Sequence, residues 1–306
     1  MCSPRLSYRP IKELKSKLFL NITKTEINKS YLILIICMDD YKIIFSGTGN
    51  GRVVLSTQLR STAGIILKLN DEILYLDPGP GALAKLPKFK IGAEKISALL
   101  VSHAHQDQAG DINNLIDAMT VGGINKKGLL LTSKSVIEGL DGDCPTISNF
   151  HKACLNESRI LNPGDKHKLK DIEVTATKTK HGDPTCIGFK IKAGKTVVSY
   201  TADTQYFRNI EEQYKDSDIL ILCNQRPYNA PLKGTLHCND SVKIINKVKP
   251  KLAVISQFGM KMLQANPLYE ARRMQKETGV NVMAAEDDLI LDALTYSKSL
   301  RQKTLF

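Results

Sequence analysis

Two of the six histidines in this chain lie in one short segment, His-Ala-His-Gln-Asp at residues 103–107. The segment directly follows an apolar run, Ile96–Val101, which is typical of a buried β-strand. Because alternate residues of an extended chain point to the same side, His103, His105 and Asp107 can converge on one point. Two imidazoles and a carboxylate are ligands that a borderline divalent cation such as zinc prefers. The segment therefore predicts a metal site in the loop that leaves this strand.

Three further polar residues also lie at the ends of predicted strands. His181 lies between two strands, Asp203 follows the run Thr196–Tyr200, and Gln257 follows the run Leu252–Ser256. Open α/β architectures place their functional residues at the ends of strands. All three positions are therefore candidates for a functional site.

The elements that must position these residues alternate between strands and helices. Apolar residues at spacings of three and four after Asp111 predict a helix, and further helices are expected from Asp240 to Pro250 and from Asn266 to Gly279. Paired strands early in the chain, followed by strand–helix units, indicate an α/β fold in which helices sandwich two sheets. The expected strands are Tyr41–Phe45, Ile65–Leu69, Ile73–Leu76, Ile96–Val101, Leu129–Thr132, Ile172–Thr175, Ile187–Ile191, Thr196–Tyr200, Ile219–Cys223, Leu252–Ser256 and Val280–Ala284.

Composition limits the class of protein. The chain has 306 residues, of which 42% are hydrophobic, and this is enough for a large core and excludes a mainly disordered chain. The longest uninterrupted apolar run, Leu32–Met38, is far shorter than the ~18–20 residues of a membrane span, so no membrane protein is expected. The net charge of +12 favours anionic partners such as phosphorylated substrates, although a solvated basic surface is the simpler explanation.

The first 37 residues differ from the rest of the chain. They contain seven basic and two acidic residues and no glycine. We expect residues 1–37 to be a basic N-terminal extension, either disordered or preceding a true start at Met38, with an added strand or helix as the alternative. Residues 38–306 are expected to form one domain. Seven cysteines without a C-x-x-C pair and no signal peptide predict reduced thiols and a cytoplasmic protein.

Taken together, the motifs resemble the metallo-β-lactamase superfamily over roughly Met38 to Asp292. The resemblance implies an α/β fold of the αββα four-layer sandwich type, with a metal site along one edge between the two sheets. It rests on segments that occur in the order of the family, namely Gly47–Gly51, Leu76–Gly81, His103–Gln108, His181, Thr201–Thr204 and Gln257–Gly259.

The resemblance also implies roles for individual residues. By position, His103, His105 and His181 match the three imidazoles of the first metal site of the family. Asp203 matches the carboxylate that bridges two metals, and Asp107 matches the carboxylate of the second site. Each of these residue types is present at the matching position of this chain.

Two departures from the family pattern fall in the second metal site. Gln108 and Gln257 stand where the family usually has histidine, and a neutral amide oxygen is a weaker donor to zinc than an imidazole. The first site keeps every ligand. We therefore expect one zinc ion per chain. A second ion, or manganese, iron or magnesium in an oxygen-rich site that includes Asp107 and Asp203, is the alternative.

Three residues are assigned roles around the metal. With one metal bound, Asp107 is free to act as a general base. His237 resembles a histidine of phosphodiesterase-like members that donates a proton to the leaving group, and a surface histidine at a helix start is the alternative. Asp77 resembles the structural aspartate that holds the histidine loop in place beneath the site.

These roles predict a metal-dependent hydrolase that acts on an ester or phosphodiester through a metal-bound water. The expected partner is a small-molecule or phosphate-containing substrate, and nucleic acid is a further option. The alternative is a catalytically degraded protein of this fold with a binding or regulatory role, which Gln108 and Gln257 favour. The oligomeric state stays open, with a homodimer as one option.

Overall fold

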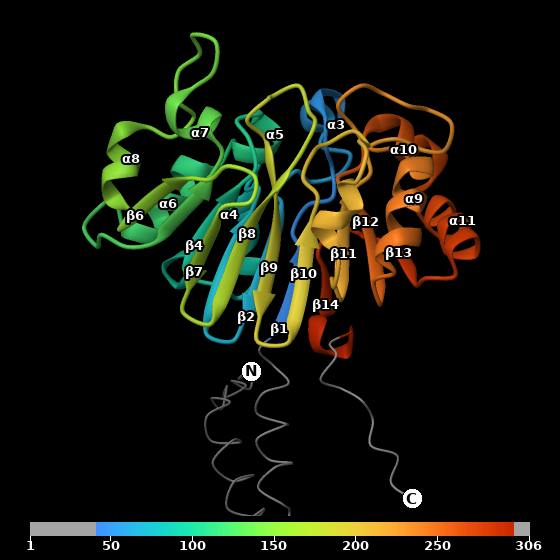
Figure 1. Ribbon diagram of the computed structural model, residues 1–306. Helices are drawn as coiled ribbons and strands as arrows, with labels where there is room; N and C mark the ends of the chain where they lie inside the picture. The colour runs from blue at the N-terminus through green and yellow to red at the C-terminus, as the bar shows by residue number, and fades with distance from the viewer. Residues whose placement is uncertain (1–40, 297–306) are drawn as a thin grey trace, which may run out of the picture. The chain divides into compact units, whose positions relative to one another are not determined.

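Two mixed sheets of seven strands each lie face to face in the computed structural model, which describes residues 41–296 (Figure 1). The predicted N-terminal extension, residues 1–37, lies outside the described residues. The first sheet has the strand order β14 (Leu289–Asp292), β1 (Tyr41–Phe45), β2 (Ile65–Leu69), β3 (Glu72–Leu76), β4 (Ala98–Val101), β5 (Leu129–Thr132) and β6 (Glu157–Ile160). The second has the order β13 (Val282–Ala284), β12 (Leu252–Ser256), β11 (Ile219–Cys223), β10 (Thr196–Tyr200), β9 (Ile187–Ala193), β8 (Ile172–Lys178) and β7 (Lys166–Leu169).

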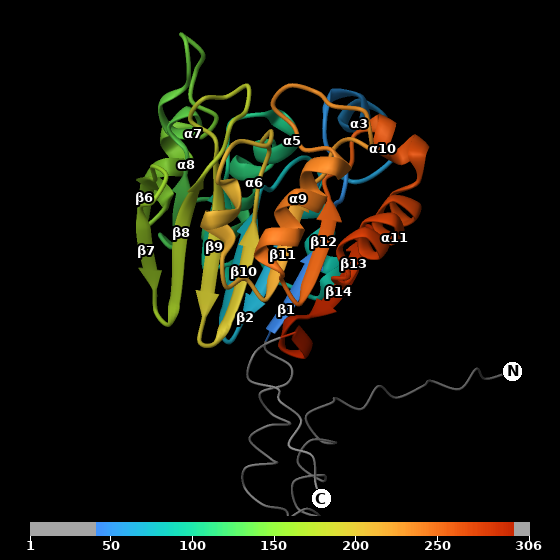
Figure 2. The same cartoon turned by 45° about the vertical axis from the view of Figure 1, so that its right-hand side comes forward.

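Helices cover the outer faces of both sheets, as Figures 1 and 2 show from two sides. The first sheet is covered by α4 (Ala82–Lys85), α6 (Ile112–Thr120), α7 (Lys134–Glu138) and α8 (Asn149–Cys154), and the second by α9 (Cys238–Val248), α10 (Met260–Ala265) and α11 (Pro267–Thr278). Two short helices, α3 (Arg52–Thr57) and α5 (Gln106–Ala109), lie at one end of the sandwich. The predicted αββα four-layer sandwich is therefore confirmed.

The central core lies between the two sheets. Ile43 and Phe45 of β1 face inward, whereas Ile44 between them packs against the helices of the first sheet. The central strands β11 and β12 are buried along their whole length, because a sheet packs on one of their faces and helices pack on the other. This double burial explains why they read as unbroken apolar runs in the sequence.

The strands that the sequence did not predict are β6, β7 and β14. Each is an edge strand of its sheet. β6 and β7 are mostly polar, as in Lys-His-Lys-Leu of β7, whereas β14 is a short segment of sequence Leu-Ile-Leu-Asp. An edge strand has one neighbour and is partly exposed to solvent, so its residues need not be apolar.

One predicted helix boundary was wrong. Helix α9 begins at Cys238 rather than at Asp240, and its N-cap is His237.

Parallel pairing brings the ends of several strands to one edge of the sandwich. In the first sheet β3, β4 and β5 are parallel, and in the second β10, β11, β12 and β13 are parallel. The loops that follow β4, β10 and β12 contain predicted site residues, and His181 follows β8, which runs in the same direction as β10. The carboxyl ends of parallel strands are the usual position of functional sites in α/β folds.

A buried carboxylate ties the two sheets together at this edge. Asp77, directly after β3, accepts hydrogen bonds from the backbone N–H of Ser102 at 2.6 Å and from its hydroxyl at 2.8 Å. The hydroxyl of Tyr200, the last residue of β10 in the opposite sheet, donates to the same carboxylate at 2.7 Å. All three residues are buried. These bonds fix the start of the histidine loop, which agrees with the structural role predicted for Asp77.

Two smaller findings concern thiols and membranes. The five cysteines within the described residues are all free thiols. No helix between residues 41 and 296 combines the length and the apolar character needed to cross a lipid bilayer.

We expect the bond from Tyr200 to Asp77 to contribute measurably to stability. Tyr200→Phe removes a donor to a buried carboxylate and should lower the free energy of unfolding by about 1.5–3 kcal/mol. Urea unfolding followed by circular dichroism measures the change. Tyr269→Phe is the matched control, because Tyr269 is 62% exposed and should change stability by less than about 0.5 kcal/mol. Equal effects of the two substitutions would contradict this account of the inter-sheet link.

We expect Asp77 to make stability depend on pH below neutrality. Burial raises the pKa of Asp77 from 3.8 to about 7, although hydrogen bonds from Ser102 and Tyr200 oppose the shift. The folded state therefore binds this proton more tightly than the unfolded chain does. The contribution of Asp77 to the free energy of unfolding must fall as pH rises between these two values, by up to about 1.4 kcal/mol per pH unit.

The measurement is the free energy of unfolding of the wild type minus that of Asp77→Asn, taken as a function of pH. We expect the difference to fall up to about pH 7 and then to level off. A difference that is constant through this range would show that Asp77 does not titrate there.

Candidate metal centre

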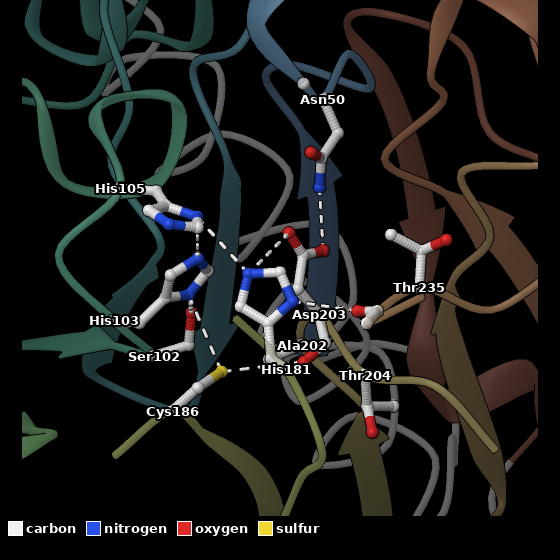
Figure 3. A network of polar contacts seen from close by, with 12 residues as sticks. Asn50, Ser102, His103, His105, His181, Cys186, Ala202, Asp203, Thr204 and Thr235 are labelled. Carbon is white, nitrogen blue, oxygen red and sulfur yellow. Dashed lines mark hydrogen bonds and ion pairs between the residues drawn. The ribbon is translucent and has the colours of Figure 1, made fainter. Parts of the chain in front are cut away.

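Four predicted ligands meet at the edge between the two sheets (Figure 3). His103 and His105 come from the loop after β4, His181 from the loop between β8 and β9, and Asp203 from the loop after β10. One ligand atom from each of the four lies within 4.8 Å of the ligand atoms of the other three. The structure thus brings together side chains that the first and the second sheet supply separately.

Nitrogen atoms of the three imidazoles converge closely. His105 Nδ1 lies 2.8 Å from His103 Nε2 and 3.2 Å from His181 Nε2. Asp203 Oδ2 lies 4.0 Å from His181 Nε2 on the other side of the cluster. Neutral imidazoles do not need to gather in this way to satisfy their hydrogen bonds, whereas a cation requires such convergence of lone pairs.

The tautomer of His103 is set by the residues beneath it. With Asp77 ionised, the Ser102 hydroxyl donates to that carboxylate and must accept from His103 Nδ1, 2.9 Å away. His103 Nε2 then carries a free lone pair that points into the cluster. Imidazoles that bind metals are usually oriented by such a bond at the other ring nitrogen.

The tautomer of His181 is set in the same manner. Its Nδ1 donates to the carbonyl oxygen of Gly234 at 2.8 Å, and the N–H of Gly234 donates in turn to the side-chain oxygen of Gln205 at 3.0 Å. A carbonyl oxygen only accepts, so His181 Nε2 also presents a lone pair to the cluster. Gly234 has a φ of +81°, a conformation that favours glycine over other residues.

The electrostatics of the cluster favour a bound cation. Burial lowers the pKa of His103 well below its usual range, and the nearby His181 and His105 lower it further, so this ring is neutral. Burial also raises the pKa of Asp203, with an opposing effect of His181 and a further raising effect of Asp107. Neutral imidazoles beside a buried carboxylate are the protonation states that a divalent ion stabilises. The residues present therefore fit a divalent metal ion.

Three residues at the exits of strands adopt a left-handed backbone conformation. Asp77 has a φ of +46°, Ala202 of +51° and Gln257 of +59°. Each turns the chain sharply where it leaves a strand, and Ala202 directly precedes the ligand Asp203. Such conformations are uncommon in residues other than glycine and concentrate at functional sites.

The remaining predicted ligands, which the family pattern places in a second metal site, are Asp107, Gln108 and Gln257. Asp107 Oδ2 accepts a hydrogen bond from the N–H of Gly51 at 2.7 Å. Gln108 and Gln257 are 1% exposed. Within residues 41–296, both amide atoms of Gln108 and the amide oxygen of Gln257 have no hydrogen-bond partner. Buried unpartnered amides indicate bound water or another ligand beside them.

His237 is placed at the N-cap of α9. Its Nδ1 lies 2.7 Å from Asp240 Oδ2, an ion-pair distance at which the geometry is not that of a hydrogen bond. The described residues that line the cavity above the histidines include Thr235 but not His237. The predicted role of His237 as a proton donor stays a prediction.

Cys186 also contacts the cluster (Figure 3). Its Sγ lies 3.6 Å from His103 Nδ1 and donates to the carbonyl oxygen of Asp203 at 3.5 Å. Burial raises the pKa of the Cys186 thiol well above its usual range, so the thiolate does not form near neutral pH. A neutral buried thiol is a poor nucleophile.

Sequence reasoning missed two residues that contact Asp203. Asn50 Nδ2 donates to Asp203 Oδ1 at 2.8 Å, and Gln225 Nε2 donates to Asp203 Oδ2 at 3.0 Å. Asn50 lies in the glycine-rich turn after β1, and Gln225 lies two residues after β11. The signal that could have identified Gln225 is a polar residue after an apolar strand, and the same signal identifies Gln257.

The turn that carries Asn50 is anchored from distant parts of the chain. Asp287, just before β14, accepts hydrogen bonds from the N–H of Thr48 at 2.9 Å, from its hydroxyl at 2.6 Å and from the N–H of Ser61 at 2.8 Å. The N–H of Asn50 donates to the carbonyl oxygen of Phe258 at 3.1 Å. The position of Asn50 is therefore determined by the C-terminal half of the described chain.

An open cavity of about 400 Å³ lies directly above the cluster. Its walls include the ligands His105, His181 and Asp203, together with Asp107, Gln225 and the cationic side chain of Arg52. A substrate group that enters this cavity reaches the histidine cluster. The size and polar lining suit a small molecule or the end of a larger one.

Comparison with known proteins places the chain in a family. A family model described as "Beta-lactamase superfamily domain" matches residues 73–256. The chain is 37% identical over 255 residues to protein MJ1374 of Methanocaldococcus jannaschii, which covers 83% of this chain and 95% of that protein. It is 26% identical over 228 residues to a ribonuclease Z of Methanosarcina mazei, with coverage of 59% and 73% respectively.

A solved structure agrees with these matches. The metallo-β-lactamase fold protein YhfI from Bacillus subtilis has a TM-score of 0.67 and 21% sequence identity, over 82% of this chain and 98% of that chain. This similarity shows that the fold is shared. The family model and the extent of the match to MJ1374 show descent as well. The chain therefore belongs to the metallo-β-lactamase superfamily of metallo-hydrolases.

Proposed function

We propose that this protein is a metal-dependent hydrolase that binds one zinc ion through His103, His105, His181 and Asp203 and cleaves a phosphodiester or another ester. The observation that carries the proposal is the convergence of imidazole nitrogens and a buried carboxylate beneath an open cavity. Three imidazoles and one carboxylate are a donor set typical of zinc. A zinc ion supplies Lewis acidity and lowers the pKa of a water molecule towards neutrality.

Asp107 is the residue that we assign to proton transfer. Its carboxylate lines the cavity, and the N–H of Gly51 holds one of its oxygens in place. A carboxylate in this position can accept a proton from a water molecule at the cavity floor. His237 is the N-cap of α9, and its contact with Asp240 orients the imidazole ring. The role that we propose for His237 is to donate a proton to a leaving group.

Among possible esters, we favour a phosphodiester. The relatives include ribonuclease Z enzymes, the chain carries a net charge of +12, and Arg52 contributes a cation to the wall of the cavity. A guanidinium group binds phosphate oxygens well because its donors match their geometry. A small phosphodiester and the end of a nucleic acid are the two forms of substrate that this chemistry fits.

The second candidate is a binding protein that has lost catalysis. The observation that favours it is the burial of Gln108 and Gln257 in neutral form around the cluster. The complete first ligand set and its orienting hydrogen bonds favour an enzyme instead. Hydrolysis assays with bis(p-nitrophenyl) phosphate, with and without added zinc, separate the two candidates.

We expect His181→Ala to abolish both metal binding and hydrolysis. Loss of a hydrogen-bond partner of a metal ligand lowers metal affinity by ~10–100-fold. Loss of the ligand itself should lower zinc affinity by more. Bound zinc is measured by elemental analysis, and activity is measured with bis(p-nitrophenyl) phosphate. His167→Ala is the matched control, since His167 lies on the edge strand β7. Retention of zinc by His181→Ala would contradict the proposed ligand set, and zinc binding without hydrolysis of any phosphodiester would favour the binding protein.

We expect Asp107→Asn to lower kcat by about 10²–10⁴-fold while zinc content stays the same, because the amide cannot accept the proton. The same substitution at Asp117, an exposed residue of α6, is the control and should leave kcat unchanged. A large loss of zinc in Asp107→Asn would show that this carboxylate is a ligand instead.

His237→Ala, assayed in parallel, should lower kcat because a proton donor is lost, and it should retain zinc.

A further inference from the structure

We propose that the amide groups of Gln225 and Asn50 take the place of a second metal ion beside Asp203, so that the centre holds a single ion. This inference rests on the proposed function, since it concerns the same centre. It goes beyond the replacement of the usual histidines by Gln108 and Gln257. Those two residues only weaken the binding of a second ion, whereas the amides of Gln225 and Asn50 form hydrogen bonds to the carboxylate that a second ion would need as a ligand.

The hydrogen bonds of Asp203 carry the argument. Asn50 Nδ2 donates to Oδ1 at 2.8 Å, and Gln225 Nε2 donates to Oδ2 at 3.0 Å (Figure 3 shows the bond from Asn50). Gln225 Nε2 also donates to the amide oxygen of Asn50 at 2.8 Å. Both hydrogens of the Gln225 amide are thus used, and both oxygens of Asp203 accept a bond from an amide.

Two amides can replace a cation at this position because they supply partial positive charge at the same oxygens. All three residues are at least nine-tenths buried, with exposures of 3% for Asp203, 1% for Asn50 and 8% for Gln225. A buried carboxylate needs hydrogen-bond donors or a cation. Asp203 Oδ2, which accepts from Gln225, also lies 4.0 Å from His181 Nε2. A carboxylate oxygen has two lone pairs, so Oδ2 can accept the amide hydrogen and still bind the first ion.

The backbone holds both amides in place. The carbonyl oxygen of Gln225 accepts a hydrogen bond from the N–H of Gly259 at 3.2 Å, and the N–H of Asn50 donates to the carbonyl oxygen of Phe258 at 3.1 Å. A Cβ atom at Gly259 would lie 2.8 Å from the Gln225 oxygen, so this close approach requires glycine. Neither amide can leave Asp203 by a simple loop movement.

Few charged donors surround the second position. The acidic groups beside it are Asp107 and Asp203, and the first of these is held by the N–H of Gly51. Gln108 and Gln257 add only neutral amides. Their unpartnered buried atoms need a partner, and water supplies one without a net charge. The second position is therefore an amide-lined site for water.

The test replaces the surrogate amide with a carboxylate. In Gln225→Glu, three carboxylates, those of residues 107, 203 and 225, surround the second position, and their repulsion is relieved by a cation. The purified full chain is stripped with chelator, dialysed against excess Zn²⁺ or Mn²⁺, and bound metal per chain is counted by native mass spectrometry. Gln106→Glu is the matched control, because it adds the same charge at an exposed residue of the cavity wall.

We expect one ion per chain in the wild type and in Gln106→Glu, and two ions in Gln225→Glu. Two ions in the wild type would overturn the inference and leave the proposed hydrolase intact. One ion in Gln225→Glu would also overturn it, since Gln225 would not be what excludes the second ion. No ion in the wild type with either metal would overturn the proposed function and this inference together.

A second variant covers the case in which Gln225→Glu does not fold, as judged by circular dichroism. Gln225→Ala removes one donor from Asp203 without adding charge, and we expect the affinity for the single ion to fall by about 10–100-fold. Competition with a chromogenic chelator measures this affinity. An affinity equal to that of the wild type would show that Gln225 does not hold the carboxylate in position for the metal.

Discussion

The metal centre depends on one buried carboxylate, Asp77, and on the three hydrogen bonds that it accepts. Two come from Ser102 in the first sheet and one comes from Tyr200 in the second. Because these groups are buried, breaking any of the bonds leaves a polar group without a partner, and the loop at Ser102 has little freedom. The same Ser102 hydroxyl orients His103, so the contact that joins the sheets also sets the tautomer of a ligand.

This arrangement makes the centre a property of the interface between the sheets. The first sheet supplies His103 and His105, whereas the second supplies His181 and Asp203. Neither sheet contains a complete ligand set. The packing of the apolar core between the sheets is therefore what brings the four ligand atoms within 4.8 Å of one another.

The two oxygens of Asp203 differ in a way that bears on chemistry. Oδ1 accepts a hydrogen bond from Asn50, whereas Oδ2 accepts one from Gln225 and also lies 4.0 Å from His181 Nε2. In a two-metal hydrolase both sides of such a carboxylate would bind cations, and the second ion would share in stabilising the transition state. With amides in that place, the cationic Arg52 is the residue of the cavity wall that can supply positive charge to an anionic transition state.

Much of the site was predictable from local sequence. His103, His105 and Asp203 follow apolar runs and His181 lies between two predicted strands, and residues at strand exits point to sites in α/β folds. The central strands were readable because burial on both faces makes them continuously apolar, whereas the short edge strands β6, β7 and β14 were not. The resemblance to the family also predicted, from Gln108 and Gln257, a change confined to the second metal position.

The hydrogen bonds that govern Asp203 were decided by tertiary structure alone. Asn50 lies 153 residues from Asp203 and 175 residues from Gln225 along the chain, and no periodicity or spacing relates them. Hydrophobic periodicity reports which face of an element is buried, because burial is a local property of strands and helices. Which polar side chains then meet depends on how two sheets pack and where their loops end, and that is set by contacts far apart in the sequence.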